Sequence, residues 1–389
     1  MKQFFNKFAL FIPLCVLLLL CIVEWCLYTW TPYSYFYSRG TQIPNVDYVA
    51  TTRGDFVVED IFATKQPRQA RYVTDKYGSR NINFLSKPDV LIFGESFGQG
   101  AGIGHKFTPA VQLSELTEYS VVVAPQSYDP FTNKNQIEMA LHVIMHQDPA
   151  NPKFILLIYN DSLLWFWDHE YDFEKTIKLT KEYSAKKDLL SKIRINHIKL
   201  KNYISDYSPM TIISRKFKSY IKVKLKILSN YFSIYSIDDK KYLQTDNGTI
   251  IFDPIPNEID ISNLNNSALQ KLRKLAITHK HLYNLGLQKN IVVIPLIVPD
   301  KSFAYYNEIN NTDYYSKFPG VILEDYIKSL SLPVVSVYPE FLKAVHDELN
   351  NNGNPVYWGD DSHWNGLGIK IAMSKVGEQI KKIDNSVNK

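Results

Sequence analysis

Cysteine is scarce in this chain, which has three: Cys15, Cys21 and Cys26. Because all three lie near the start, the rest of the sequence can form no disulfide, and it holds no Cys-x-x-Cys metal or redox motif. A domain of this size does not need disulfides, so their absence leaves the compartment open. Glycine and proline, at 16 and 19 residues, are too few for a collagen-like or low-complexity chain.

A strong net charge is also lacking, and the formal charge of +5 does not by itself indicate a nucleic-acid partner. What is present is apolar material, since 45% of the 389 residues are hydrophobic and 14% are aromatic. That fraction supports a substantial core and excludes wholesale disorder. The length predicts two or three domains, or one large domain with insertions.

A long apolar stretch covers residues 8–30, with Glu24 as its interruption. It is long enough to cross a hydrocarbon core of about 30 Å as a helix. Two lysines precede it and the next basic residue is Arg39, which predicts a cytoplasmic tail at 1–7 and an extracytoplasmic remainder. A cleaved signal peptide is the alternative, but no A-x-A-like site follows the apolar core. A lipoprotein site at Cys21 is weaker still, because a leucine precedes it.

A regular alternation of short apolar strands and helices begins at residue 88 and runs to about 385. It follows an extracytoplasmic lead-in at 31–87, of which residues 31–70 are polar and turn-rich. The lead-in contains a strand-like stretch at 55–58. Strands are expected at 89–93, 120–124, 154–159, 291–298 and 333–337, and helices at 133–145, 267–285, 339–348 and 366–382. This pattern predicts an α/β fold whose parallel sheet is covered on both faces.

A long insertion at about 165–260 interrupts the alternation, and its pattern is helical. Its centre, 175–226, holds 15 Lys and Arg against 3 Asp and Glu, a local balance of +12. One interpretation is an amphipathic element that lies on anionic lipid or an acidic polymer. The other is a solvated basic face on an ordinary helical cap. No nucleic-acid motif accompanies it, and we expect no nucleic-acid partner.

Three polar features follow strands or precede the last helix, where ligands bind in open parallel sheets. Ser96 lies in the glycine-rich turn Gly94–Gly100, and its backbone N–H can point at a developing oxyanion. His363 lies in the loop 360–366 close behind Asp360 and Asp361, which can orient its imidazole as a general base. The alternative interpretations assign no catalytic role to these residues. Ser96 would be an ordinary serine in a turn, and His363 a surface histidine beside acidic residues that cap a helix.

The third feature is Asn160, directly after the strand expected at 154–159. Its side-chain amide is a possible oxyanion donor, and the alternative is a simple helix N-cap.

Together these blocks resemble the SGNH (GDSL-like) hydrolase superfamily, whose first block reads G-D-S-x-x-x-G and whose last reads D-x-x-H. The resemblance places Ser96 on the nucleophile, His363 on the base, Asp360 on the acid and Asn160 on an asparagine of the oxyanion hole. It implies a three-layer α/β/α flavodoxin-like domain, here at 88–385.

Two further stretches are similar to particular groups within that superfamily. Residues 73–81, VTDKYGSRN, resemble the TD-x-x-G-x-RN lead-in of membrane-anchored bacterial members. Residues 298–301, VPDK, and the His-Trp-Asn tail from His363 are similar to proteins related to alginate O-acetyltransferase. The resemblance covers about 72–164 and 285–385, and the basic insertion lies outside it.

The sequence also departs from the family pattern. Glu95 stands where Asp is usual, and Ile158 replaces a glycine of the third block. The glycine of the second block, whose backbone N–H completes the oxyanion hole, is replaced near 124–128, and Ser127 is our candidate. In the acetyltransferase-like relatives the acid lies two residues before the histidine, so Asp361 is the alternative to Asp360.

A nucleophile elbow of the α/β-hydrolase type is the rival interpretation, because Gly94-x-Ser96-x-Gly98 fits its motif. In that fold the elbow follows several strands, and the acid and the base usually lie on separate loops. Here Ser96 follows the first predicted strand of the sheet, and the acid and the base share one loop, which favours the SGNH arrangement.

We therefore expect a single-pass protein of the bacterial inner membrane with a periplasmic serine esterase domain that needs no cofactor and no metal. The resemblance implies that it acts on ester groups, chiefly O-acetyl, of envelope glycans or lipids. The alternatives are an O-acyltransferase that modifies a surface polysaccharide, fed by a multi-spanning acyl-donor membrane protein, and a catalytically inactive binding protein of the same fold.

Overall fold

The computed structural model describes residues 18–20, 22–23, 47–52, 68–75, 79–83, 85, 87–124, 136–146, 150–161, 241–245, 248–252, 264, 266–310, 315–359 and 362–387. The chain divides into two compact units, one formed by Met1–Thr41 with Asp188–Ile237 and one by Gln42–Lys187 with Asp238–Lys389. Of the first unit, the structure describes 18–20 and 22–23, which are helical. All other described residues belong to the second unit.

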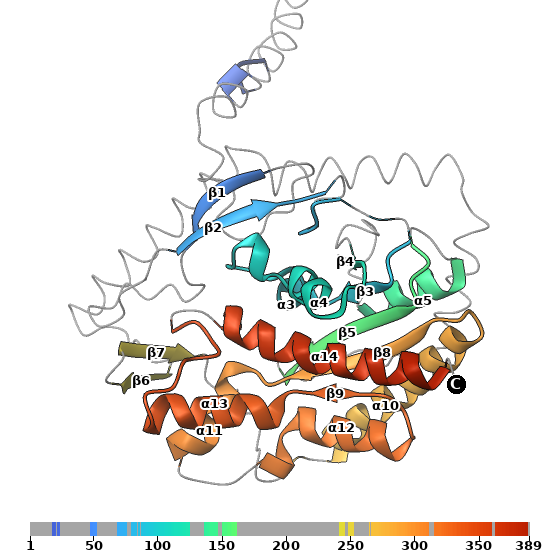
Figure 1. Cartoon of the computed structure of the whole chain (residues 1–389). Helices are drawn as coiled ribbons and strands as arrows, with labels where there is room; N and C mark the ends of the chain where they lie inside the picture. The colour runs from blue at the N-terminus through green and yellow to red at the C-terminus, as the bar shows by residue number, and fades with distance from the viewer. Residues whose placement is uncertain are drawn as a thin grey trace, which may run out of the picture. The chain divides into compact units, whose positions relative to one another are not determined.

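A five-stranded parallel sheet forms the centre of the second unit (Figure 1). Across the sheet its strands come in the order β4 (Val121–Val123), β3 (Val90–Phe93), β5 (Phe154–Asn160), β8 (Val292–Val298) and β9 (Val335–Ser336). The three inner strands, β3, β5 and β8, are buried along almost their whole length, which explains why nearly all of their residues are apolar. The α/β class predicted from the sequence is confirmed.

Successive residues of each strand supply two separate hydrophobic cores, because side chains alternate between the faces of a sheet. Val90 and Ile92 of β3 pack in one core with Ala110, Leu113 and a row of residues from the last helix. Leu91 and Phe93 pack in the other with apolar residues of the helices after β4 and before β8. Burial of each large side chain is worth about 1.5–3 kcal/mol, so both cores hold the sheet between helices.

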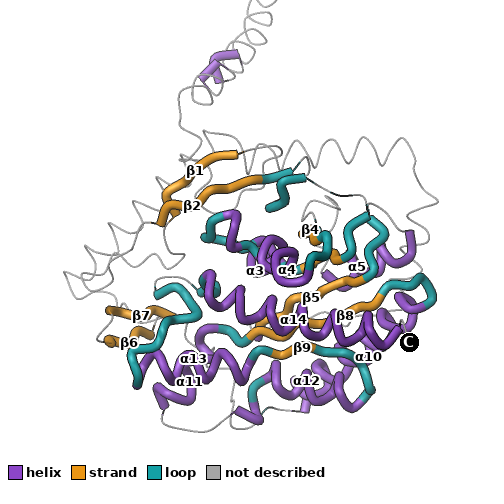
Figure 2. The backbone as a smooth tube through the Cα atoms, viewed as in Figure 1, coloured by secondary structure: helices purple, strands orange, loops and turns teal. Residues whose placement is uncertain are grey.

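Helices connect successive strands and cover both faces of the sheet (Figure 2). Those whose residues enter the first core are α3 (Glu95–Gln99), α4 (Pro109–Thr117), α11 (Lys301–Asn310), α13 (Tyr338–Asn350) and α14 (Gly366–Val387). Those on the second core are α5 (Gln136–His146), α10 (Asn266–Leu287) and α12 (Pro319–Ser329). Single 3₁₀ turns, η1 (His105–Phe107) and η3 (Tyr315–Lys317), precede α4 and α12.

Two antiparallel hairpins complete the described part of the second unit. The first pairs β1 (Asp47–Thr52) with β2 (Arg68–Val73), whereas the strand expected at 55–58 lies outside the described residues. The second pairs β6 (Lys241–Thr245) with β7 (Gly248–Phe252). It falls within the insertion that we predicted to be helical, so that prediction is wrong for these residues. The sequence Asp-Asn-Gly between two β-branched and aromatic runs is a hairpin signal that outweighs the helical pattern.

The remaining predictions about the insertion and the anchor concern residues that are largely not described. The basic centre of the insertion, 175–226, lies entirely outside them. Of the anchor predicted at 8–30, the described residues are 18–20 and 22–23. Within the described part of the chain, no helix combines the length and the apolar character needed to span a membrane.

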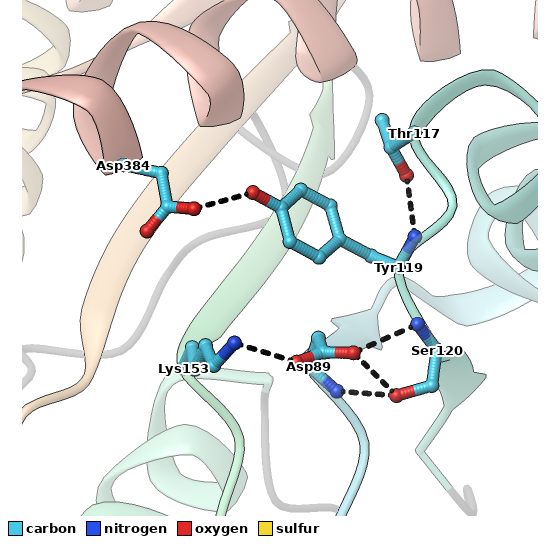
Figure 3. A network of polar contacts seen from close by, with 6 residues as sticks. All are labelled: Asp89, Thr117, Tyr119, Ser120, Lys153 and Asp384. Carbon is cyan, nitrogen blue, oxygen red and sulfur yellow. Dashed lines mark hydrogen bonds and ion pairs between the residues drawn. The ribbon is translucent and has the colours of Figure 1, made fainter.

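A polar network joins the amino ends of three neighbouring strands (Figure 3). Asp89, just before β3, accepts hydrogen bonds from the backbone N–H and the hydroxyl of Ser120 at 2.9 and 2.7 Å, and pairs with Lys153 at 3.0 Å. Tyr119 donates to Asp384 of α14 at 2.7 Å. This network lies at the amino edge of the sheet, whereas Ser96 follows β3 and Asn160 ends β5 at the opposite, carboxyl edge.

Candidate functional site

Ser96 lies in the first turn of α3, directly after β3. The chain turns from strand to helix at Gly94, where a Cβ atom would come within 2.8 Å of the Cβ of Ile158 on the neighbouring strand β5. Glycine is therefore required for α3 to begin this close to the sheet. As the second residue of the helix, Ser96 has a backbone N–H among the first four, which have no partner within the helix.

The other end of the short helix is fixed by a second glycine. Gly100 has φ of +66°, a left-handed conformation that a side chain would strain, and its N–H donates to the carbonyl of Phe97 at 3.2 Å. The carbonyl of Ser96 accepts from Ala101 at 2.9 Å. The close contact at Gly94 and the left-handed conformation at Gly100 explain why the predicted block has a glycine at each end. The two hydrogen bonds fix the turn that carries Ser96.

His363 lies in a tight loop that leads into α14. The loop is closed by an isolated antiparallel bridge between Tyr357 and Trp364, whose side chains are both 1% exposed. Asn365 fixes its end, since its side chain donates to the carbonyl of Pro355 at 2.7 Å and accepts from two N–H groups in the first turn of α14. The buried Trp364 and the capped helix thus define where the histidine side chain lies.

Ser96 and His363 meet although 267 residues separate them along the chain. The distance from His363 Nε2 to Ser96 Oγ is 2.7 Å, which is a short hydrogen bond. The ring of Phe97 packs against the imidazole, with centroids 5.0 Å apart, and against the indole of Trp364 at 5.4 Å. Both partners are half-buried.

Asn160 ends β5 at the carboxyl edge of the sheet, the edge from which the turn after β3 also departs. It is 5% exposed. Asn160 shares a face of β5 with Ile158, because residues two apart point the same way. That is the face of the first core, to which Phe97 and Trp364 belong, so Asn160 lies on the same side of the sheet as the serine and the histidine.

Asp161, the next residue, is a buried carboxylate that sequence reasoning missed. It accepts hydrogen bonds from the backbone N–H of Asp300 at 2.9 Å, from that of Gly320 at 3.0 Å and from the hydroxyl of Tyr338. Burial raises the pKa of Asp161 to about 7, although these bonds act in the opposite direction. By holding the ends of β5 and β8 and the start of α12 together, it fixes the carboxyl edge on which Asn160 lies.

The lead-in stretch at 73–81 acts as a clamp on the turn that carries Ser96. The buried guanidinium of Arg80 donates to the carbonyls of Gly100 and Ile103 at 3.0 and 2.7 Å. It also lies over the ring of Tyr72, 4.2 Å from the centroid. The backbone N–H of Arg80 donates to Gln99 at 3.1 Å, so the clamp reaches the last residue of α3 as well.

The same stretch also holds the end of β4. Asn81 donates to Val123 O at 2.9 Å and accepts from Val123 N–H at 2.9 Å, while Asp75 accepts from the Asn81 amide at 2.7 Å. Gln99 donates to Ala124 O at 3.1 Å. The motif could be read from the sequence, but its role as a link between the α3 turn and β4 could not.

Three of the predicted site residues lie outside the described residues: Ser127, Asp360 and Asp361. The structure brings together Ser96 and His363, and places Asn160 at the same edge and face of the sheet. Within the described residues, no three His, Cys, Asp or Glu side chains are grouped as a metal site requires.

No family model, curated protein or solved structure matches this chain.

A serine hydroxyl bonded to a histidine ring nitrogen is the core of an activated nucleophile, because the imidazole can take the hydroxyl proton as the oxygen attacks. The other ring nitrogen then needs an orienting partner, a role for which Asp360 and Asp361 remain predictions. The N–H of Ser96, in the first turn of α3, is of the kind that can stabilise the negative charge formed by that attack.

Proposed function

We propose that this protein is a membrane-anchored serine esterase of the SGNH type, which cleaves ester groups, chiefly O-acetyl, on envelope glycans or lipids. The observation that carries the proposal is the 2.7 Å contact between His363 Nε2 and Ser96 Oγ. Residues so distant in the chain, in two blocks that resemble those of one hydrolase family, have no structural need to share this bond at the edge of a sheet.

The fold supports the same assignment at a finer level. Numbered along the chain, the parallel strands lie in the order 2-1-3-4-5, the doubly wound order of flavodoxin-like sheets. Ser96 follows the first of these strands and His363 precedes the last helix. We infer a three-layer SGNH domain, with an N-terminal membrane helix at 8–30 and a periplasmic location as further parts of the proposal.

In the proposed reaction, Ser96 Oγ attacks the ester carbonyl carbon while His363 Nε2 takes the hydroxyl proton. The oxyanion is stabilised by the Ser96 N–H, the Asn160 amide and a backbone N–H at Ser127, each donor being worth about 3–4 kcal/mol of barrier. His363 returns the proton to the departing alcohol, which leaves an acyl-serine. Water, activated by the same imidazole, then releases the acid and restores the hydroxyl.

The experiment uses the purified full chain, a fluorophosphonate probe and a chromogenic acetyl ester. We expect probe labelling and ester cleavage to fall about 10³-fold or more in Ser96→Ala and in His363→Ala. They should be unchanged in Ser329→Ala, a matched control whose exposed hydroxyl bonds only to a backbone carbonyl of its own helix in the described structure. Labelling that survives in Ser96→Ala would exclude Ser96 as the nucleophile.

The acceptor of the acyl group is the second question that this experiment answers. The hydroxyl–imidazole pair serves transfer to water and transfer to a sugar hydroxyl equally, so an oligosaccharide is added to the ester assay. Acyl transfer that exceeds hydrolysis would reassign the protein as an O-acyltransferase, with a multi-spanning acyl-donor membrane protein as its partner. Inertness toward both the probe and the esters would instead favour a binding protein on the same fold.

A further inference from the structure

Lys301, the first residue of α11, carries one of the most deeply buried side chains of the described structure, at 1% exposed. Burial of an ammonium group costs several kcal/mol unless hydrogen bonds compensate for the lost water. Here Nζ donates to the carbonyl of Trp358 at 2.6 Å and to that of Gly359 at 2.9 Å. Hydrogen bonds from a charged donor are roughly twice as strong as those from a neutral donor, so Lys301 fixes the backbone of residues 358–359.

Trp358, one of the two residues whose carbonyls Lys301 binds, also pairs with the backbone of His363. The N–H of Trp358 donates to His363 O at 3.3 Å, and the bridge between Tyr357 and Trp364 lies one residue away. Residues 357–358 therefore form a short support, against which 363–364 are held in antiparallel register. A shift of Trp358 would carry the histidine with it.

Lys301 is itself held by the ends of two strands. Tyr357 donates its hydroxyl to Pro299 O at 2.6 Å, a second tie between the segment after β8 and the support. The N–H of Asp300 is bonded to the carboxylate of Asp161 after β5. Burial raises the pKa of Glu348 and the charge of Lys301 lowers it, so the two groups attract each other.

We propose that Lys301 is a positioning residue, which sets the His363 imidazole within hydrogen-bond distance of Ser96 by fixing the 357–358 support. Its effect on catalysis rests on the proposed function, whereas its effect on the position of His363 does not. The position can thus be tested even if the chain proves not to be an esterase.

The test replaces the ammonium with a side chain of similar length that cannot donate, Lys301→Met, in the full chain. We expect the rate of Ser96 labelling by the fluorophosphonate to fall at least tenfold, and kcat to fall by the same factor while KM changes less than threefold. Carbethoxylation of His363 by diethyl pyrocarbonate, followed by mass spectrometry, should accelerate at least threefold, because a released imidazole is less shielded. This second readout needs no catalysis.

Two controls separate positioning from stability and from charge. Ile327→Val removes one buried methyl group from α12 and lowers the melting temperature without touching the support, so it should change neither readout more than twofold. Lys370→Met removes an exposed cation from α14 and should behave like the unaltered chain. Lys301→Arg keeps a cation but is too long for the same geometry, and we expect an intermediate loss.

Two outcomes separate the positioning role of Lys301 from the proposed esterase function. If either Lys301 variant folds and leaves both the labelling rate and the His363 carbethoxylation within twofold, the proposal is overturned. If the unaltered chain reacts with neither probe nor ester, but His363 still becomes more reactive in a Lys301 variant, the positioning role stands and the proposed esterase function fails.

Discussion

Gly94 shows how a single hydrogen atom in place of a side chain positions Ser96. A methyl group there would lie 2.8 Å from Ile158 Cβ and 3.2 Å from backbone atoms of Gly98, so either β5 or α3 would have to move. We expect Gly94→Ala to lower the free energy of unfolding by about 1–3 kcal/mol through overpacking. Because α3 carries Ser96, a shift of α3 that relieves this contact should lower the rate of Ser96 labelling as well.

Gly98→Ala is the matched control four residues further on. A Cβ at Gly98 meets its nearest neighbours at 3.6 Å or more, an ordinary contact, and alanine is the better helix former. Its free energy of unfolding should stay the same or rise by about 0.4–1 kcal/mol. Denaturant titrations of both variants check this, and equal effects at the two glycines would contradict the assigned role of Gly94.

At the scale of elements, the clamp formed by the lead-in depends on the side-chain amide of Asn81, which makes three hydrogen bonds. It donates to Asp75 and to Val123 O, and it accepts from Val123 N–H. Asn81→Asp keeps the shape of the side chain but removes the donor to Val123 O and places a second carboxylate against Asp75. We expect a loss of about 1.5–3 kcal/mol in the free energy of unfolding, the net value of a hydrogen bond to a charged group. Slower labelling of Ser96 should accompany it, because the clamp also carries Arg80.

Asn351→Asp provides an exposed version of the same change. Asn351 also donates to an aspartate, Asp347, at 3.2 Å, but Asn351 is exposed and Asp347 is only half-buried. Solvent screening should limit its cost to about 0.5 kcal/mol, with no effect on labelling. A cost at Asn81 no larger than the cost at Asn351 would show that the clamp contributes nothing beyond a surface contact.

The network at the amino edge of the sheet predicts a dependence of stability on pH. Burial raises the pKa of Asp89, but hydrogen bonds from Ser120 and the charge of Lys153 outweigh it, so the net pKa lies below the ordinary value. A carboxyl group whose pKa is lowered by folding adds stability above its unfolded pKa of about 3.9, and this contribution is lost as the pH falls through the folded pKa.

Asp89→Asn should therefore cost about 1–2 kcal/mol at pH 7, and progressively less as the pH falls below about 4. Chemical denaturation of both proteins between pH 7 and pH 3 measures the difference. Ser96 labelling at pH 7 serves as the control, because the network lies at the edge opposite the candidate site. A cost that stays constant with pH would mean that the carboxylate charge does not act there.

The strands were predictable from the sequence because a buried parallel strand must be apolar on both faces. The expected strands at 89–93 and 291–298 differ from β3 and β8 by one residue at their starts. The one-turn helix α3 and the longer helices α4, α11 and α12 were not predicted. Pro109 and Pro319 stand at the first positions of α4 and α12, which is a recognised start signal. Short helices of mixed composition leave too weak a periodic pattern.

The residues of the candidate site also divide into those that the sequence could predict and those that it could not. Ser96, His363 and Asn160 could be proposed because their spacing from strand ends and their resemblance to family blocks are local properties of the sequence. The buried cations Arg80 and Lys301 could not be assigned roles, since lysine and arginine are read as surface residues until the folded chain shows what covers them. Their partners are backbone carbonyls, which leave no trace in the residue pattern.

At the scale of the whole molecule, the charges around the first apolar stretch predict its orientation. Two lysines precede residues 8–30 and the next basic residue is Arg39, so the domain that holds Ser96 and His363 should lie outside the cytoplasm. The three natural cysteines all fall inside this stretch, where a membrane would shield them from water-soluble reagents. An introduced cysteine should therefore account for almost all of the labelling by a water-soluble reagent.

Lys370→Cys, at an exposed position of α14, should react with a membrane-impermeant maleimide on intact spheroplasts. Gln3→Cys, in the predicted cytoplasmic tail, should react only after detergent opens the membrane, because the reagent cannot reach it otherwise. The unaltered chain measures the background of Cys15, Cys21 and Cys26. If the order of reactivity is reversed, the domain faces the cytoplasm and envelope glycans are excluded as substrates. If both sites react at once, the first 30 residues do not span a membrane at all.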